Sequence, residues 1–199
     1  MVLSAERRSL LVRTAAREFA RVGFEQASLN AVIRDCGLSK SSFYHVLDSK
    51  AALYELVIDD IARDLAAALD APEPAAFAGP EFWQRVEEFI GRLAEVLASD
   101  EAFTQLAHMI YDRRPPRDDG AGARVTQTAQ AWVGELVAVG RDCGAVRADL
   151  PESLQGALAV AVLRAMDEWS VAHLDEIPAA AMPALLAAQF AALRRLLDA

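Results

Sequence analysis

The chain has 199 residues, of which 54% are apolar and 25% charged, so it is long and apolar enough for one or two folded domains and is not expected to be disordered. Its longest apolar stretches, such as Ala157–Leu163, are far shorter than the ~20 residues of a membrane-spanning helix. The N-terminus, Met1–Ser4, lacks an export signal. We therefore expect a soluble, cytoplasmic protein that does not bind membranes. Two cysteines, Cys36 and Cys143, are too few for a disulfide framework or a thiolate metal site.

The net charge of −9 argues against a nucleic-acid partner, but the charge is unevenly distributed. Residues 1–50 hold eight Lys or Arg against five Asp or Glu, a net charge of +3, so the remaining 149 residues carry −12. The only two lysines, Lys40 and Lys50, both lie in this basic segment. The segment could face a polyanion, although a solvated helical surface explains the same count equally well.

Proline spacing and apolar periodicity predict an all-α fold. Proline is absent before Pro72, and the later prolines separate segments rich in helix-forming residues. Within the segments apolar residues recur at helical spacing, as Leu11, Ala15 and Phe19 do, whereas alternation with a period of two is scarce. We expect about nine helices, near residues 4–22, 28–36, 39–46, 49–70, 81–98, 100–112, 120–143, 151–175 and 179–197. The predicted capping residues are Ser4, Ser28, Ser39, Ser49 and Ser99.

Two short predicted helices near the N-terminus have the pattern of a helix-turn-helix. Gly37 can end the first helix in the left-handed conformation, and Ser39 can cap the second. The outer face of the second helix is rich in hydrogen-bonding side chains: Ser39, Lys40, Ser41, Ser42, Tyr44 and His45. Such a face suits phosphate contacts and base contacts in a major groove. A single serine would serve equally well as a cap or in solvent, but the combination with both lysines indicates DNA binding.

Several residue types recur here at fixed spacing: Gly23-Phe24, Ser28-Leu29, Gly37 through His45, Ser49-Lys50 and Leu53. On these residues, segment 4–58 resembles the N-terminal DNA-binding domain of the tetracycline-repressor (TetR) family of transcriptional regulators. The resemblance implies that Ser39–His45 form the recognition helix. It implies base or nearby phosphate contacts by Lys40, Ser41, Ser42 and His45, and backbone contacts by Ser28, Tyr44 and Lys50.

Two positions depart from the family pattern. Val46 stands where the family usually has His or Tyr, and Leu47 stands where it usually has Phe. Val46 cannot donate a hydrogen bond to a phosphate, so we expect one backbone contact to be missing. Leu47 still suits a core position, so the expected fold is unchanged.

We expect a helix-turn-helix DNA-binding domain over residues 1–48 and a helical effector-binding and dimerisation domain over 49–199. The last two predicted helices carry broad apolar faces and many alanines that allow helices to approach closely. We interpret them as a two-fold, four-helix dimer interface, which the resemblance also implies. In the alternative, these residues all belong to the core of one monomer.

Half of the aromatic residues fall within residues 77–132. Aromatic walls with few polar groups suit a pocket for an apolar or aromatic small molecule, although an aromatic stripe also fits a plain core. The resemblance favours a pocket. The candidate ligand-binding residues are Phe82, Phe89, Phe103, His108, Met109, Tyr111, Trp132, Met166 and Trp169, with Gln105, Arg113 and Glu135 as further polar candidates.

No pattern in the sequence points to an enzyme, a metal site or a cofactor. The three histidines lie on different predicted helices, and there is no nucleophile elbow, Walker loop or Rossmann glycine pattern. The sequence therefore predicts a homodimeric regulator, most readily a repressor, that binds a palindromic operator in double-stranded DNA and is released by a small-molecule effector. The alternative is a small-molecule carrier with a non-functional DNA-binding head, as the −12 body and Val46 would allow.

Overall fold

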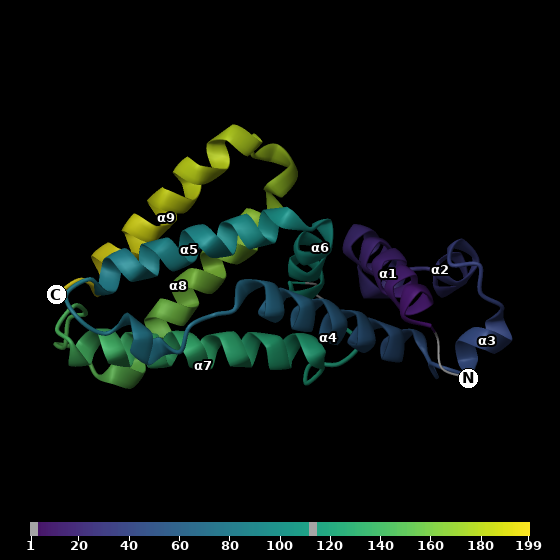
Figure 1. Cartoon of the computed structure of the whole chain (residues 1–199), viewed down its shortest axis with the longest axis horizontal. Coiled ribbons are helices and arrows are strands. Elements are labelled where there is room, and N and C mark those ends of the chain that lie inside the picture. Colours follow the sequence, from purple (N-terminus) through teal and green to yellow (C-terminus); the bar gives the residue numbers. More distant parts are fainter. Residues whose placement is uncertain (1–3, 112–114) are drawn as a thin grey trace. The chain divides into compact units, whose positions relative to one another are not determined.

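The computed structural model describes residues 4–111 and 115–199, so the expectations for Met1–Leu3 and Arg113 lie outside the described residues. Within them the chain forms nine α-helices and three short 3-10 helices, and the only β pairing is an isolated bridge between Val146 and Asp198 (Figure 1). The all-α prediction is confirmed. The α-helices are α1 (Ala5–Gln26), α2 (Leu29–Asp35), α3 (Lys40–Tyr44), α4 (Lys50–Leu69), α5 (Phe82–Ser99), α6 (Glu101–Ile110), α7 (Ala121–Asp142), α8 (Glu152–Ala172) and α9 (Met182–Leu197).

Serine side chains begin four of these helices, as expected. The hydroxyl oxygens of Ser4, Ser28, Ser39 and Ser49 each accept the backbone N–H three residues further on. The prediction that Ser99 caps the next helix is wrong. Ser99 is the last residue of α5, and its hydroxyl donates to the Val96 carbonyl at 2.7 Å, while the Asp100 carboxylate accepts from the Ala102 N–H at 2.9 Å and caps α6. A carboxylate also interacts more favourably than a hydroxyl with the positive end of a helix.

Helix α1 changes direction near its end. Gly23 has φ 74° and ψ 169°, a conformation that only glycine adopts readily, and it interrupts the helical geometry before Phe24. The expected helix end at residue 22 corresponds to this interruption. The turn brings Phe24 against Phe19 and Tyr54, with ring centroids 6.2 and 5.4 Å away.

The chain divides into two compact units, and the division falls inside α5 and α7. The first unit comprises the described residues of 1–70 and 95–126, and the second comprises residues 71–94 and 127–199. Each unit has its own apolar core. The expected boundary at residue 48 separates a DNA-binding domain from an effector-binding domain by function. The division into compact units does not test it, so it stays a prediction.

The core of the first unit lies between α1, α4 and α6. Helix α1 packs on both α4 and α6, and its residues Leu11, Ala15 and Phe19 are almost completely buried. Val32, Ile33 and Phe43 from the two short helices join this core. The short helices thus owe their positions to apolar contacts with α1 and α4, because helices of five to seven residues are unstable alone.

The core of the second unit is rich in aromatic rings. Phe77, Phe89 and Trp132 meet with centroids 5.0 to 5.8 Å apart, and the Trp132 indole donates to the Pro72 carbonyl at 3.0 Å. Phe82 and Trp83 pack edge to face at the other end of the same core.

Candidate nucleic-acid interface

The turn between α2 and α3 closes α2 with two hydrogen bonds. The Leu38 N–H donates to the Ile33 carbonyl at 3.0 Å, and the Gly37 N–H donates to the Arg34 carbonyl at 2.9 Å. Gly37 has φ 63°, so the pattern is a Schellman motif with glycine at its left-handed position. This confirms the predicted role of Gly37 and fixes the angle at which the chain enters α3.

Helix α3 is held by a cap and by one buried ring. The Ser39 hydroxyl accepts the Ser42 N–H at 3.0 Å, and the two hydroxyl oxygens lie 2.8 Å apart. Phe43 is 1% exposed and anchors the helix in the core of the first unit. The opposite face of α3 is consequently turned to solvent.

That solvent face carries Lys40, Ser41, Tyr44 and His45, all exposed. The Tyr44 side chain is 53% exposed and rests its ring edge against Phe43, with centroids 5.3 Å apart. The exposed ring offers a flat apolar surface, and its hydroxyl end can donate or accept a hydrogen bond. The structure thus brings four of the predicted DNA-binding residues together on one face.

Ser28 lies at the start of α2 and is also exposed. Its hydroxyl accepts the Ala31 N–H at 3.3 Å, and its own N–H donates to the Glu18 carboxylate at 3.0 Å. This backbone bond, together with Arg21, holds the pKa of the Glu18 carboxyl below its usual value. The hydroxyl can still donate one hydrogen bond, because a serine oxygen has one proton besides its acceptor sites.

Lys50 differs from the other predicted DNA-contacting residues because its ammonium group already donates hydrogen bonds within the protein. Its Nζ donates to three backbone carbonyls, those of Phe24, Glu25 and Ala27, and the side chain is half-buried. A phosphate contact by Lys50 stays a prediction, and it would compete with these three bonds.

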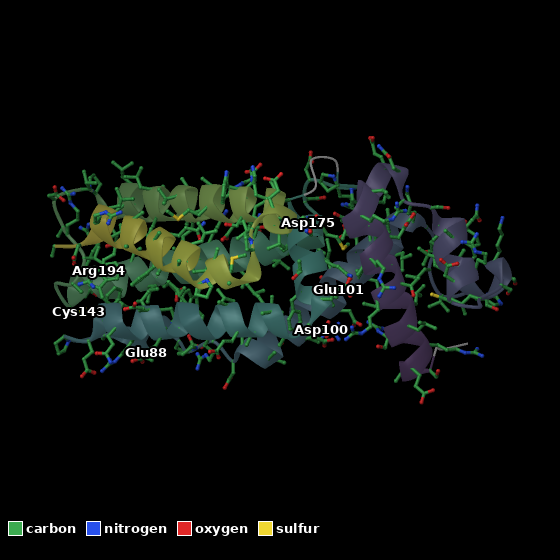
Figure 2. The ribbon with its side chains drawn as sticks, turned by 90° about the horizontal axis from the view of Figure 1, so that it is seen from above. Glu88, Asp100, Glu101, Cys143, Asp175 and Arg194 are labelled. Atoms are coloured by element: carbon green, nitrogen blue, oxygen red, sulfur yellow. The ribbon has the colours of Figure 1, made fainter. Side chains whose placement is uncertain are left out.

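Most cations of the basic segment are ion-paired. Five arginines of residues 1–50 have acidic partners, and three of those partners lie in α4 and at the start of α6: the pairs are Arg8–Asp60, Arg13–Asp100, Arg17–Glu101, Arg21–Glu18 and Arg34–Asp35. Figure 2 shows Asp100 and Glu101 next to α1. Lys40 has no ion pair within residues 4–111 and 115–199, and it is the one lysine on α3. The net charge of +3 therefore overstates the positive charge available to DNA.

The predicted ligand-binding residues are divided between the two compact units. Phe103 and Met109 are buried in the core of the first unit, where His108 and Tyr111 are half-buried. Of those in the second unit, Phe82 is buried, Phe89 and Trp132 pack on each other, Met166 is half-buried and Trp169 is 48% exposed. Trp169 stacks on His173 with centroids 4.4 Å apart.

A groove of about 650 Å³ runs between α7 and α8 in the second unit. Its lining residues are mostly small or polar, and none was predicted to bind a ligand: Gln130, Gly134, Glu152, Ser153, Gly156, Ala157, Val160, Ala161 and Arg164. Gly134 and Gly156 let the two helices approach closely here, since a Cβ on Gly156 would lie 4.0 Å from the Gly134 Cα.

The described residues hold no cluster of metal ligands and no membrane-spanning helix. No three His, Cys, Asp or Glu side chains in residues 4–111 and 115–199 gather closely enough to hold a metal ion. In those ranges, every helix is too short or too polar to cross a lipid bilayer. Of the two cysteines, Cys36 is half-buried, and burial raises the pKa of its thiol, whereas Cys143 is exposed at the end of α7.

Residues 11–57 match the family model described as bacterial regulatory proteins, tetR family. The match spans α1, α2, α3 and the start of α4, which is the arrangement that carries the exposed face of α3. This segment thus matches the DNA-binding domain of the TetR family. Members of this family are DNA-binding transcriptional regulators and are not enzymes. A search of curated proteins found no match to this sequence.

Solved structures share the fold of this chain over nearly its full length. A TetR family transcriptional regulator from Chloroflexus aurantiacus has a TM-score of 0.67 and 19% identity, covering 99% of this chain and 95% of that one. A TetR family regulator from Agrobacterium tumefaciens gives 0.69 and 13%, with 98% of each chain covered. The tetR regulator TylP from Streptomyces fradiae gives 0.68 and 16%, covering 100% and 89%.

Sequence reasoning missed two features of the site. It did not find the ion pairs of α1, because Asp60 and Asp100 are far from their arginines in sequence. It also did not find the three carbonyl partners of Lys50. The one available signal was the position of Lys50 at the start of a helix, where a cation is unfavourable.

Proposed function

We propose that this protein is a transcriptional regulator of the TetR family, a homodimeric repressor that binds a palindromic operator and is released by an apolar or aromatic small molecule in the cytoplasm. The observation that supports the proposal is the exposed polar face of α3, a helix that follows a turn held by hydrogen bonds. Lys40, Ser41 and His45 would face bases, with Ser42 and Ser39 near the phosphates at the helix start. Tyr44 and Ser28 would donate to the DNA backbone.

The proposed dimer interface uses the solvent faces of α8 and α9. One stripe of α8 exposes small residues flanked by large apolar ones, with Leu154 and Trp169 46% and 48% exposed: the stripe is Leu154, Ala157, Ala161, Ala165 and Trp169. On α9, Ala184, Ala187 and Ala188 are exposed. Facing stripes of small residues let helices of two copies pack closely, and a two-fold axis would present two α3 helices to two half-sites.

The effector is proposed to bind in the second unit, where the half-buried rings of Phe89 and Trp132 lie 5.0 Å apart and tilted by 33°. Such rings offer apolar surface to an aromatic ligand without burying an unpaired polar group. Binding would favour a conformation with less affinity for the operator. Quenching of tryptophan fluorescence by an aromatic probe such as 1-anilinonaphthalene-8-sulfonate, lost in Phe89→Ala, would support this site.

The DNA-binding proposal is tested by selecting sequences from random duplex DNA with the full chain. Enrichment of an inverted repeat supports it, because two copies with two-fold symmetry read two related half-sites. Absence of enrichment at low salt would contradict it. That result would favour the second candidate function, a small-molecule carrier, which the ion pairing of five of the eight cations in residues 1–50 makes worth testing.

Replacing Lys40 should weaken operator binding. Lys40→Ala removes the unpaired cation of α3, so we expect a loss of about 1–3 kcal/mol if Lys40 reads a base, or a salt dependence flatter by about one charge if it contacts a phosphate. Arg34→Ala is the matched control, because Arg34 is exposed on α2 but already paired with Asp35 at 2.9 Å. Titrations of the selected operator at several salt concentrations measure both quantities. Equal losses in the two variants would argue against α3 as the contact face.

A further inference from the structure

Lys50 is the first residue of α4, a position that does not favour a cation. The N-terminus of a helix carries partial positive charge, so a lysine there is repelled by the helix dipole. The first turn of α4 contains no acidic residue that would offset this repulsion. The cap of α4 is supplied by Ser49, not by Lys50. The lysine must therefore be stabilised from outside its own helix.

Three carbonyls at the end of α1 supply that stabilisation. The Lys50 Nζ lies 2.7 Å from the Phe24 oxygen, 3.0 Å from the Glu25 oxygen and 3.2 Å from the Ala27 oxygen. The ammonium has three protons, so each carbonyl takes one. It also sits 4.6 Å from the centroid of the Phe24 ring. The last turn of α1 has no basic residue of its own, so Lys50 provides the positive charge that the C-terminal end of α1 favours.

These three hydrogen bonds join the two ends of one segment of the chain. Ala27 comes immediately before the cap of α2, and Lys50 comes five residues after His45, the C-cap of α3. The segment between them, residues 28–49, contains α2, the turn and α3. Lys50 therefore fixes the distance between the point where the helix-turn-helix begins and the point where it ends.

We propose that Lys50 is a positioning residue for DNA binding, which holds residues 28–49 in the arrangement that presents α3 rather than binding a phosphate itself. The proposal rests on the proposed DNA-binding function. At this position lysine has a specific advantage over arginine, because one ammonium nitrogen can direct three protons at three converging oxygens. The flat guanidinium spreads its donors in a plane and suits a phosphate at least as well as lysine does.

The first test needs no DNA. Hydrogen exchange of the amides in residues 28–49 is measured for the full chain and for Lys50→Met, Lys50→Arg and Lys40→Met. We expect exchange to be faster by on the order of tenfold in Lys50→Met, since bonds from a charged donor are lost, and to be unchanged in the control Lys40→Met. Lys50→Arg should show an intermediate increase, and it decides the test should Lys50→Met fail to fold by circular dichroism. Unchanged exchange in both Lys50 variants would overturn the proposal.

The second test measures affinity for the selected operator against salt concentration. A positioning residue predicts weaker binding by Lys50→Met and Lys50→Arg with the salt dependence of the wild type. A phosphate ligand predicts a slope smaller by about 0.9 in Lys50→Met and wild-type binding by Lys50→Arg, which would overturn the proposal. If no operator is selected, the proposed function fails, while the exchange experiment still decides the role of Lys50 in the fold.

Discussion

In the first unit, charged side chains of one helix bond to the backbone ends of another, whereas in the second unit rings and small residues fill a closely packed core. Glu55 of α4 accepts the Ala121 N–H at the start of α7 at 2.5 Å, and Lys50 of α4 binds the end of α1. In the second unit, Phe77 and Trp132 meet edge to face, and Gly140 lies against Phe82. The first unit should therefore be sensitive to charge and pH, and the second to side-chain volume.

The largest effect is expected from adding volume to the second unit. A Cβ on Gly140 would lie 2.5 Å from Val146 Cγ2 and 2.7 Å from Phe82 Cζ. Gly140→Ala should therefore lower the free energy of unfolding by about 1–3 kcal/mol. Urea unfolding followed by tryptophan fluorescence measures this, because all three tryptophans lie in the second unit.

Gly134→Ala is the control, since Gly134 is on the same helix with no other heavy atom within 4 Å of its Cβ position. It should stabilise the protein by about 0.5–1 kcal/mol, as alanine favours a helix over glycine. A similar destabilisation in both variants would show that helix propensity, and not the close contact, governs this site.

A smaller effect is expected from removing the carboxylate of Glu55. Ala121 is completely buried, so its N–H would lose its partner in Glu55→Ala at a cost of about 1–2 kcal/mol. Glu55→Gln keeps an acceptor oxygen and should retain most of this energy. Hydrogen exchange of the first turn of α7 is the measurement. Equal exchange rates in Glu55→Ala and the wild type would mean that the carboxylate does not hold the helix start.

The smallest effect is expected from acid. The carboxyl pKa of Asp100 is lowered by the Ala102 N–H and by Arg13, and that of Glu18 by the Ser28 N–H and by Arg21. A lowered folded-state pKa contributes stability that is complete above about pH 5 and is lost as the pH falls through the folded pKa. As the pH falls from about 5 to about 2, the first unit should lose more stability than the second.

Urea unfolding at each pH separates the two units, because the far-ultraviolet circular dichroism reports all helices and tryptophan fluorescence reports the second unit alone. Asp100→Asn combined with Glu18→Gln should reduce the pH dependence of the first unit. An equal loss of stability in acid in both units would show that these ion-paired carboxylates do not make the first unit the more pH-sensitive one.

Local signals made most of the helices predictable. Capping serines such as Ser39 act on residues three positions away, and Gly37 needs only its own backbone geometry, so short stretches of sequence contain the necessary information. Ser99 misled the prediction because Asp100, the adjacent residue, is the better acceptor at the start of α6. The family resemblance is likewise local, covering the helices that carry the DNA-binding face.

The features that the sequence did not reveal are contacts between distant residues. Arg13 and Asp100 are 87 positions apart, and the sequence does not say that α6 lies on α1. The spacing of aromatic residues in the sequence does not indicate which core each ring joins, and Phe103 and Phe89 belong to different cores. The DNA and ligand contacts of individual residues remain predictions.

The difference between the two thiols has a practical consequence. A thiolate is the form that reacts with alkylating reagents, and the raised pKa of the half-buried Cys36 slows that reaction, while Cys143 is exposed at the end of α7 (Figure 2). The natural chain thus offers one preferred position for a maleimide spin label. In a dimer the two labels would report the distance between copies with and without operator DNA, and no cysteine would have to be added or removed.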